Sequence, residues 1–290
     1  MEHFHTPASI DLDLSPYIAR HSADKLIAYK HVAREPLYLA YFLPPAFDAN
    51  KRYPAFVFIH GGAWESRTTF GDQACWLGDH LGYLARYYAE KGFVCISVDY
   101  RLAKENGQVP GYGLIESYED CCDAIDCILK TADTYAIDTE RMFLLGESAG
   151  GHLAACVATF QYKKAFSFER VFLINPITDM NDPAWNSYVP TESDHDLLAS
   201  LNLLGRSVIL SPLYQVDKHA SATVLIHGDS DSCVDKNHSK AFYHRMQANC
   251  QSCDLHLLAE TDHAFLLAEF TDNLNACKTG IQIINSYLFC

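Results

Sequence analysis

The sequence has few positively charged residues. It contains 22 Lys and Arg residues against 36 Asp and Glu residues, for a formal net charge of −14, and its basic residues form no cluster. Binding to nucleic acid or to an anionic membrane surface normally requires clustered Lys and Arg. The composition therefore argues against such partners and is compatible with a neutral or cationic small-molecule substrate.

Long apolar runs and paired cysteine motifs are also missing. No stretch of 18 consecutive apolar residues occurs, so no membrane-spanning helix is predicted. The first residues lack the basic start and apolar run of a secretory signal, and we expect a cytoplasmic protein unless a signal peptide has been removed. Cys250 and Cys253 have the spacing of a metal or redox motif but no second pair, so we interpret them as two thiols at a helix end and expect no metal or cofactor.

The alternation of apolar patterns predicts an α/β fold. At 290 residues, 49% of them hydrophobic, the chain is expected to form a single domain with one large core. Segments of strand and helix pattern alternate, as in a mostly parallel sheet covered by helices on both faces. The expected strands are Leu37–Leu43, Ala55–His60, Phe93–Val98, Arg141–Gly146, Arg170–Asn175, Ala222–His227 and Asp254–Ala259, with Lys25–Val32 as an additional antiparallel strand beside the first. The expected helices are Asp79–Lys91, Ile115–Ala132, Gly151–Phe160, Asn237–Ala248 and Glu269–Leu288.

An irregular stretch at about 177–216 interrupts this alternation. It contains proline and aromatic residues and a segment of helical pattern at Asp194–Leu204. Long loops inside compact domains are usually functional. We therefore expect a small cap inserted over the carboxyl ends of the strands, where such sheets bind ligands.

The segment Gly146-Glu147-Ser148-Ala149-Gly150 joins an expected strand to an expected helix. A serine on such a sharp turn is presented above the sheet, and the flanking glycines let the turn close. The G-x-S-x-G pattern alone is weak evidence, but its position between strand and helix is what a nucleophile requires. Ser148 is the predicted nucleophile.

Serine needs a base to take its proton and a third group to orient that base. Asp229, Asp231 and Asp235 follow the strand Ala222–His227, and Asp231 is favoured because it fits the G-x-x-D-x-x-V pattern found after this strand. His263 follows the last strand at its carboxyl end and is the predicted base, whereas His256 lies inside that strand and is interpreted as an edge or packing residue.

Two consecutive glycines follow the strand Ala55–His60. Acyl transfer builds negative charge on a carbonyl oxygen, and backbone N–H groups aimed at that oxygen lower the barrier. We assign the oxyanion hole to the amides of Gly62, Ala63 and Ala149, and expect His60 to brace the loop.

These segments together resemble the esterase branch of the α/β-hydrolases, which includes hormone-sensitive-lipase-like carboxylesterases, acetyl esterases and small feruloyl or acetylxylan esterases. The resemblance is carried by His60-Gly61-Gly62-Ala63-Trp64, Ser97-Val98-Asp99-Tyr100-Arg101-Leu102, Gly146–His152, Gly228–Asp231 and Asp262-His263. It implies scaffold roles for Asp99 and Arg101. Ala63 replaces the third glycine of H-G-G-G and the N-terminal part is short, which weakens the case for a long-chain lipid substrate.

The sequence thus predicts a serine esterase acting on short-acyl, acetyl-like esters of a small alcohol, sugar or aryl compound. Aromatic residues near strand ends are expected to line its pocket: Trp64, Trp185, Tyr214 and Phe265. Two alternatives stay open. One is an amide-cleaving enzyme with the same triad, either kynurenine-formamidase-like or a small peptidase, and the other is a non-catalytic receptor of the same fold. The oligomeric state is not predicted.

Overall fold

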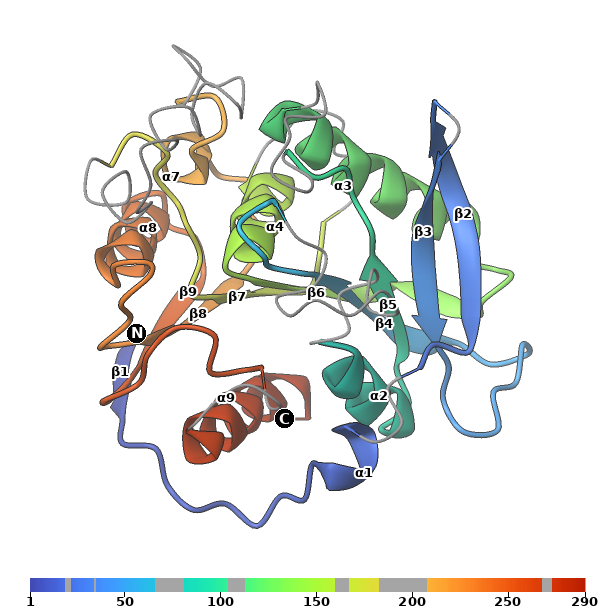
Figure 1. Ribbon diagram of the computed structural model, residues 1–290, viewed down its shortest axis with the longest axis horizontal. Coiled ribbons are helices and arrows are strands. Elements are labelled where there is room, and N and C mark those ends of the chain that lie inside the picture. Colours follow the sequence, from blue (N-terminus) through green and yellow to red (C-terminus); the bar gives the residue numbers. More distant parts are fainter. Residues whose placement is uncertain are drawn as a thin grey trace.

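A nine-stranded sheet forms the centre of the structure, with the strand order β1-β9-β8-β7-β6-β4-β5-β3-β2 (Figure 1). The computed structural model describes residues 1–18, 22–33, 35–65, 81–103, 113–159, 167–182, 208–267 and 273–289. The strands are β1 Glu2–His5, β2 Lys25–Val32, β3 Glu35–Phe42, β4 Tyr53–Ile59, β5 Val94–Val98, β6 Ile137–Glu147, β7 Arg170–Ile174, β8 Thr223–Gly228 and β9 Cys253–Leu258.

The sheet is mostly parallel, as predicted. Within the described residues, β3 is antiparallel to both of its neighbours, β2 and β5, and every other neighbouring pair is parallel. The central strands read as continuous apolar runs because helices cover both of their faces. As a result β4, β6, β8 and β9 all end at the same edge of the sheet, where ligands bind in such folds.

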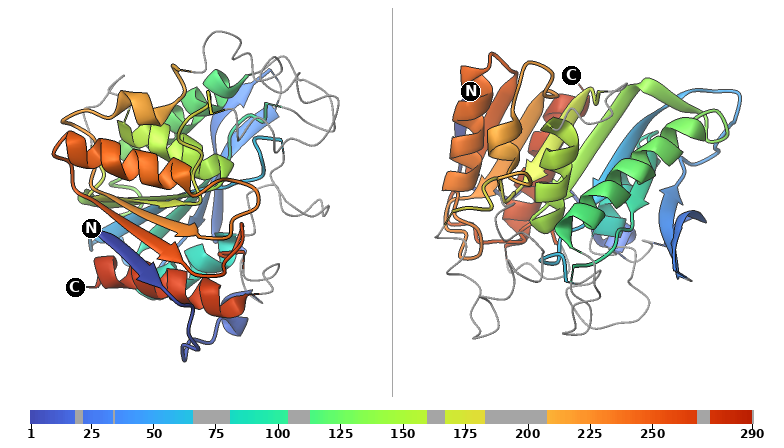
Figure 2. Two further views of the ribbon diagram at one scale, coloured as in Figure 1. Left: turned by 90° about the vertical axis from the view of Figure 1, so that its left-hand side faces the viewer. Right: turned by 90° about the horizontal axis from the view of Figure 1, so that it is seen from above.

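Helices lie on both faces of the sheet (Figures 1 and 2). One face carries α3 Leu114–Lys130, α4 Ala149–Thr159, α7 Pro212–Gln215 and α8 Asn237–Ala248, and the other carries α1 Ser15–Ile18, α2 Gly82–Glu90 and α9 Leu274–Leu288. Successive strand residues point to opposite faces. Val57 and Ile59 of β4 therefore join one buried cluster, while Phe56 and Phe58 join the other.

The amino-terminal residues differ from expectation. Glu2–His5 had no predicted role, but this segment forms β1, which pairs in parallel with β9 and closes that side of the sheet. Its side chains are exposed or half-buried, so the sequence shows no apolar pattern there. Across the described residues, no helix is long and apolar enough to cross a membrane.

Only the two ends of the predicted cap can be placed. Residues 183–207, including the expected helix Asp194–Leu204, lie outside the described part of the chain. The flanking segments are held together because Met180 N donates to Ser211 Oγ at 2.8 Å and Leu213 N donates to Thr178 O at 3.0 Å. The single-domain boundary and the cap stay predictions.

Candidate active site

Ser148 occupies the turn between β6 and α4. Its backbone has a φ of 54°, a left-handed conformation that is uncommon for a residue with a side chain and that marks functional turns. The turn is tight, since a Cβ atom at Gly150 would lie 2.2 Å from Ile59 O of β4. Ser148 N donates to Ile174 O of β7 at 2.9 Å, which fixes the turn above the sheet.

The structure brings the three residues of the predicted triad into hydrogen-bond contact. His263 Nε2 lies 2.9 Å from Ser148 Oγ, and His263 Nδ1 lies 2.7 Å from Asp231 Oδ2. A carboxylate can only accept, so Nδ1 carries a proton and Nε2 accepts from the serine hydroxyl. The geometry is that of a nucleophile, a base and an orienting acid.

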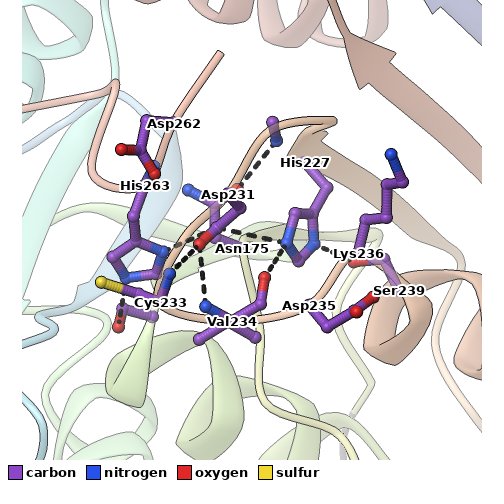
Figure 3. A network of polar contacts seen from close by, with 12 residues as sticks. Asn175, His227, Asp231, Cys233, Val234, Asp235, Lys236, Ser239, Asp262 and His263 are labelled. Carbon is purple, nitrogen blue, oxygen red and sulfur yellow. Dashed lines mark hydrogen bonds and ion pairs between the residues drawn. The ribbon is translucent and has the colours of Figure 1, made fainter. Parts of the chain in front are cut away.

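Asp231 is held in place from several directions (Figure 3). Its Oδ1 accepts from Cys233 N and Val234 N, both at 2.8 Å, and His227 Nε2 lies 3.3 Å from its Oδ2. Burial alone raises the pKa of Asp231, but the hydrogen bonds from His227 and His263 and their charges outweigh burial and lower it well below its usual value. Asp231 is therefore a stable carboxylate.

The two competing carboxylates serve the turn. Asp229 Oδ1 accepts from Glu260 N at 2.7 Å, and Asp235 Oδ1 accepts from Asn237 N at 2.7 Å at the start of α8. Neither contact involves His263. Local hydrogen bonds of this kind are typical of Asp in turns.

His263 is surrounded by carboxyl groups. Burial alone lowers its pKa, but the hydrogen bond to Asp231 and the charges of Asp231, Glu147 and Asp262 outweigh burial and raise it above the usual value. A raised pKa makes His263 a stronger proton acceptor once the serine reacts.

The loop after β4 packs against the serine turn. Gly62 has a φ of 101°, Ala63 of 54° and Trp64 of 57°, so three consecutive residues adopt the left-handed region. A Cβ atom at Gly61 would lie 3.2 Å from Ser148 Cβ. Gly61 therefore lies close to the serine turn, and the predicted oxyanion amides of Gly62 and Ala63 come directly after it. The third predicted amide belongs to Ala149, the first residue of α4, and amides in the first turn of a helix have no partner within the helix.

His60, expected to brace the loop, and Arg101, given a scaffold role by the resemblance, both have structural contacts. The His60 ring stacks on Tyr100 at 4.4 Å between ring centroids, and its Nδ1 lies 2.8 Å from Gly61 O, so it braces the loop. Arg101 Nε pairs with the buried Asp120 at 2.7 Å.

Two of the four expected pocket aromatics, Trp64 and Phe265, are buried in the core. Trp64 is fully buried with its indole edge-on to His152, and Phe265 is buried in the cluster beside α9, where a Cβ atom at Gly280 would lie 2.8 Å from its ring. Tyr214 is exposed and donates to Asp179 Oδ2 at 2.7 Å. We correct the pocket assignment of Trp64 and Phe265, because both large apolar rings are used for core packing. Trp185 lies outside the described residues.

Three side chains at the site are of types that can bind a metal ion. Ligand atoms of Asp231, Cys233 and His263 all lie within 4.8 Å of one another, and the Cys233 sulfur points toward the His263 imidazole (Figure 3). A metal ion there would compete with the Asp231–His263 hydrogen bond. At Cys250 and Cys253, by contrast, the first thiol is exposed and the second is buried at the start of β9.

Sequence reasoning missed two further polar residues that support the site. His227 places Nδ1 2.7 Å from Ser239 Oγ and Nε2 beside Asp231. Asp262 Oδ1 accepts from both Ser232 N and His263 N at 2.7 Å, which joins the acid loop to the base loop. Asp262 directly precedes His263 and His227 lies four residues before Asp231 in the sequence, but no residue pattern predicts the contacts that they make.

The parallel sheet and the serine turn define the α/β-hydrolase fold. The BD-FAE family model matches residues 39–246, and the chain belongs to this family. It is 25% identical to a probable isoprenylcysteine alpha-carbonyl methylesterase of Oryza sativa subsp. japonica over 77% of this chain and 53% of that protein. It is also 25% identical to esterase LipC of Mycobacterium tuberculosis over 80% of this chain and 56% of that protein. The chain thus spans about half the length of these curated relatives.

Solved structures share the fold. Esterase 2 of Thermogutta terrifontis with propionate bound superposes with a TM-score of 0.75 at 22% identity, covering 93% of this chain and 94% of that one. The apo form of the same esterase gives 0.75 at 23% identity, covering 91% and 93%.

Proposed function

We propose that this chain is a serine carboxylesterase that hydrolyses esters with a small acyl group through an acyl-enzyme intermediate. The observation that carries the proposal is the continuous contact from Asp231 through His263 to Ser148, with distances of 2.7 and 2.9 Å. Two of the curated relatives, an esterase and a probable methylesterase, support the same reaction class.

In the first step, Ser148 Oγ attacks the ester carbonyl while His263 Nε2 takes the hydroxyl proton. Negative charge moves to the carbonyl oxygen, toward which the amides of Gly62, Ala63 and Ala149 are assigned to donate. Asp231 stabilises the imidazolium that forms. When the carbon–oxygen bond to the alcohol breaks, His263 returns the proton to the leaving alcohol and Ser148 keeps the acyl group.

The second step is hydrolysis of the acyl-serine. Water gives a proton to His263 Nε2 and attacks the same carbonyl carbon, and the proton then passes to Ser148 Oγ as the acid leaves. All protons are accounted for by the serine, the histidine, water and the products. The reaction needs no metal ion or organic cofactor.

A small acyl group is part of the proposal. Ala63 stands where lipase-like relatives have a third glycine. Solved structures of the Thermogutta esterase hold propionate or butyrate, which are short acids. A series of p-nitrophenyl esters from acetate to decanoate should give the highest kcat/KM at the short end, and a maximum at eight or more carbons would contradict this part.

The first test is removal of the nucleophile. We expect Ser148→Ala to lower kcat for p-nitrophenyl acetate at least about 1,000-fold while the protein stays folded. Ser252→Ala, the same change at an exposed serine away from the triad, should retain activity. A fluorophosphonate probe should label wild type but not Ser148→Ala, and full turnover by the Ser148 variant would overturn the proposal. Comparing acetyl esters with N-formylkynurenine and peptide amides distinguishes an esterase from an amide-cleaving enzyme.

A further inference from the structure

The carboxyl group of Glu147 is enclosed beside the proposed base. Glu147 is the last residue of β6 and directly precedes Ser148, and its side chain is 3% exposed. Its Oε1 lies 4.0 Å from His263 Nε2, which is its one ion-pair contact among the described residues. A buried carboxylate is costly unless a positive charge or hydrogen-bond donors stabilise it. His263 is the group positioned to do so whenever it is protonated.

The loop after β4 is built to admit this carboxyl group. A Cβ atom at Gly61 would lie 2.3 Å from Glu147 Oε2 and 2.9 Å from Glu147 O. No side chain fits there without moving the carboxyl group or the end of β6. Glu147 is thus held between the loop that carries the oxyanion amides and the imidazole of His263.

The other ionisable groups around His263 occupy different positions. Asp231, from the loop after β8, bonds Nδ1 at 2.7 Å, and Asp262, in the same loop as His263, accepts from the His263 backbone. Cys233 contributes a half-buried thiol near the imidazole. Glu147 is the described carboxyl group with a contact to Nε2, the nitrogen that exchanges a proton with Ser148 and the leaving group.

We propose that Glu147 is a positioning residue that stabilises protonated His263 from its Nε2 side, so that two carboxylates, Asp231 and Glu147, share the positive charge formed during acyl transfer. The inference rests on the proposed function. It assigns the variable residue of the G-x-S-x-G motif a role in the proton transfer.

The charge of Glu147 responds to that of His263. Burial and the nearby Asp231 carboxylate raise the pKa of Glu147 to about 7, although the charge of His263 opposes this shift. Protonation of His263 therefore favours the ionised form of Glu147.

The test is the pH dependence of kcat/KM in Glu147→Gln. This change keeps the shape of the side chain and removes its charge, so protonated His263 loses a stabilising partner. We expect the acidic limb of the pH profile to move to lower pH by about one unit. Glu260→Gln, which removes an exposed carboxylate three residues before His263, is the matched control and should leave the limb in place.

A purely structural role for Glu147 predicts a different result. Lost packing would lower kcat/KM by the same factor at every pH, without moving the limb, and that outcome in folded Glu147→Gln would overturn the inference. Thermal unfolding establishes that the variant is folded. Glu147→Asp keeps the charge on a side chain one methylene shorter and should move the limb in the same direction by a smaller amount. It provides the same test if Glu147→Gln does not fold.

The two proposals fail in different ways. Turnover by Ser148→Ala would overturn the proposed function itself. If turnover depends on Ser148 but the acidic limb of the pH profile does not move in Glu147→Gln, only the role of Glu147 is overturned.

Discussion

Two histidines close together in the chain have opposite surroundings. His256 lies in β9 and stacks on His3 and His5 of β1, with centroid distances of 4.6 and 5.0 Å, while His5 Nε2 lies 2.7 Å from His256 Nδ1. Burial, together with the charges of His5 and His3, lowers the pKa of His256 to about 3. In the loop beyond, His263 is flanked by carboxyl groups that raise its pKa.

The comparison shows that neighbours decide what a histidine does. Neutral His256 joins β9 to β1 through ring stacking, and its Nε2 lies 2.9 Å from the Tyr287 hydroxyl of α9. His263 takes up a proton more readily, because nearby carboxylates stabilise its positive charge. The surroundings of His256 favour its neutral form, and those of His263 favour uptake of a proton.

The largest effect should come from removing the main carboxylate partner of His263. Asp231→Asn leaves the shape of the side chain but loses the charge and favours the wrong tautomer of the imidazole. We expect kcat for p-nitrophenyl acetate to fall by about 10⁴-fold. Asp229→Asn, a matched change in the same turn, should reduce kcat only slightly, and equal losses in both variants would contradict the assignment of Asp231.

A metal ion should interfere with His263. Zn²⁺ binds thiolate, imidazole and carboxylate ligands, and Cys233, His263 and Asp231 bring one ligand atom of each type close together. We expect Zn²⁺ to inhibit hydrolysis reversibly, with recovery on adding EDTA. Cys233→Ser should raise the inhibitory concentration about 10-fold, in the range seen when a metal site loses a supporting contact. Cys250→Ser changes an exposed thiol elsewhere, and an equal rise in that control would show that Cys233 is not a ligand.

The smallest effect concerns stability in acid. The folded state lowers the pKa of His256 below the usual 6.5, so the unfolded chain binds its proton more readily. The stabilisation is therefore complete above about pH 6.5 and is lost as the pH falls from 6.5 toward 3. His263 has the opposite sign, because its raised pKa contributes stability below pH 6.5 that is lost as the pH rises through the folded value.

Urea denaturation at pH 7.5 and pH 5.0 measures this loss. Wild type should lose about 2 kcal/mol more unfolding free energy on acidification than His256→Gln, which cannot take up the proton. His219→Gln removes an exposed histidine and should behave like wild type. If wild type and His256→Gln lose the same unfolding free energy on acidification, His256 does not have the lowered pKa described above.

The strands were predictable because buried parallel strands carry an unmistakable apolar signal. Ala222–His227 was predicted and β8 spans Thr223–Gly228; the antiparallel Lys25–Val32 has the same bounds as β2. Strand β1 was missed because its Glu and His residues hold it through backbone pairing and ring stacking, which leave no apolar pattern.

The site was predictable where chemistry and chain position coincide. Ser148, Asp231 and His263 each follow a strand at the same edge of the sheet, and the structure places them in contact. The surroundings of Glu147 were not predictable, since its burial depends on Gly61, 86 residues earlier in the chain. Trp64 and Phe265 were predicted to line a pocket but are buried in the core, because hydrophobicity does not distinguish a pocket wall from a core.

The double contact of Asp262 has a consequence for loop exchange between relatives. Its Oδ1 accepts from Ser232 and His263 together, so the two loops are fastened by a residue that belongs to one of them. A His263 loop transplanted from a protein without an acceptor at the position of Asp262 would lose this link to the Asp231 loop. Chimeras that keep Asp262 together with His263 should keep the imidazole aligned, and those that replace Asp262 should lose the alignment.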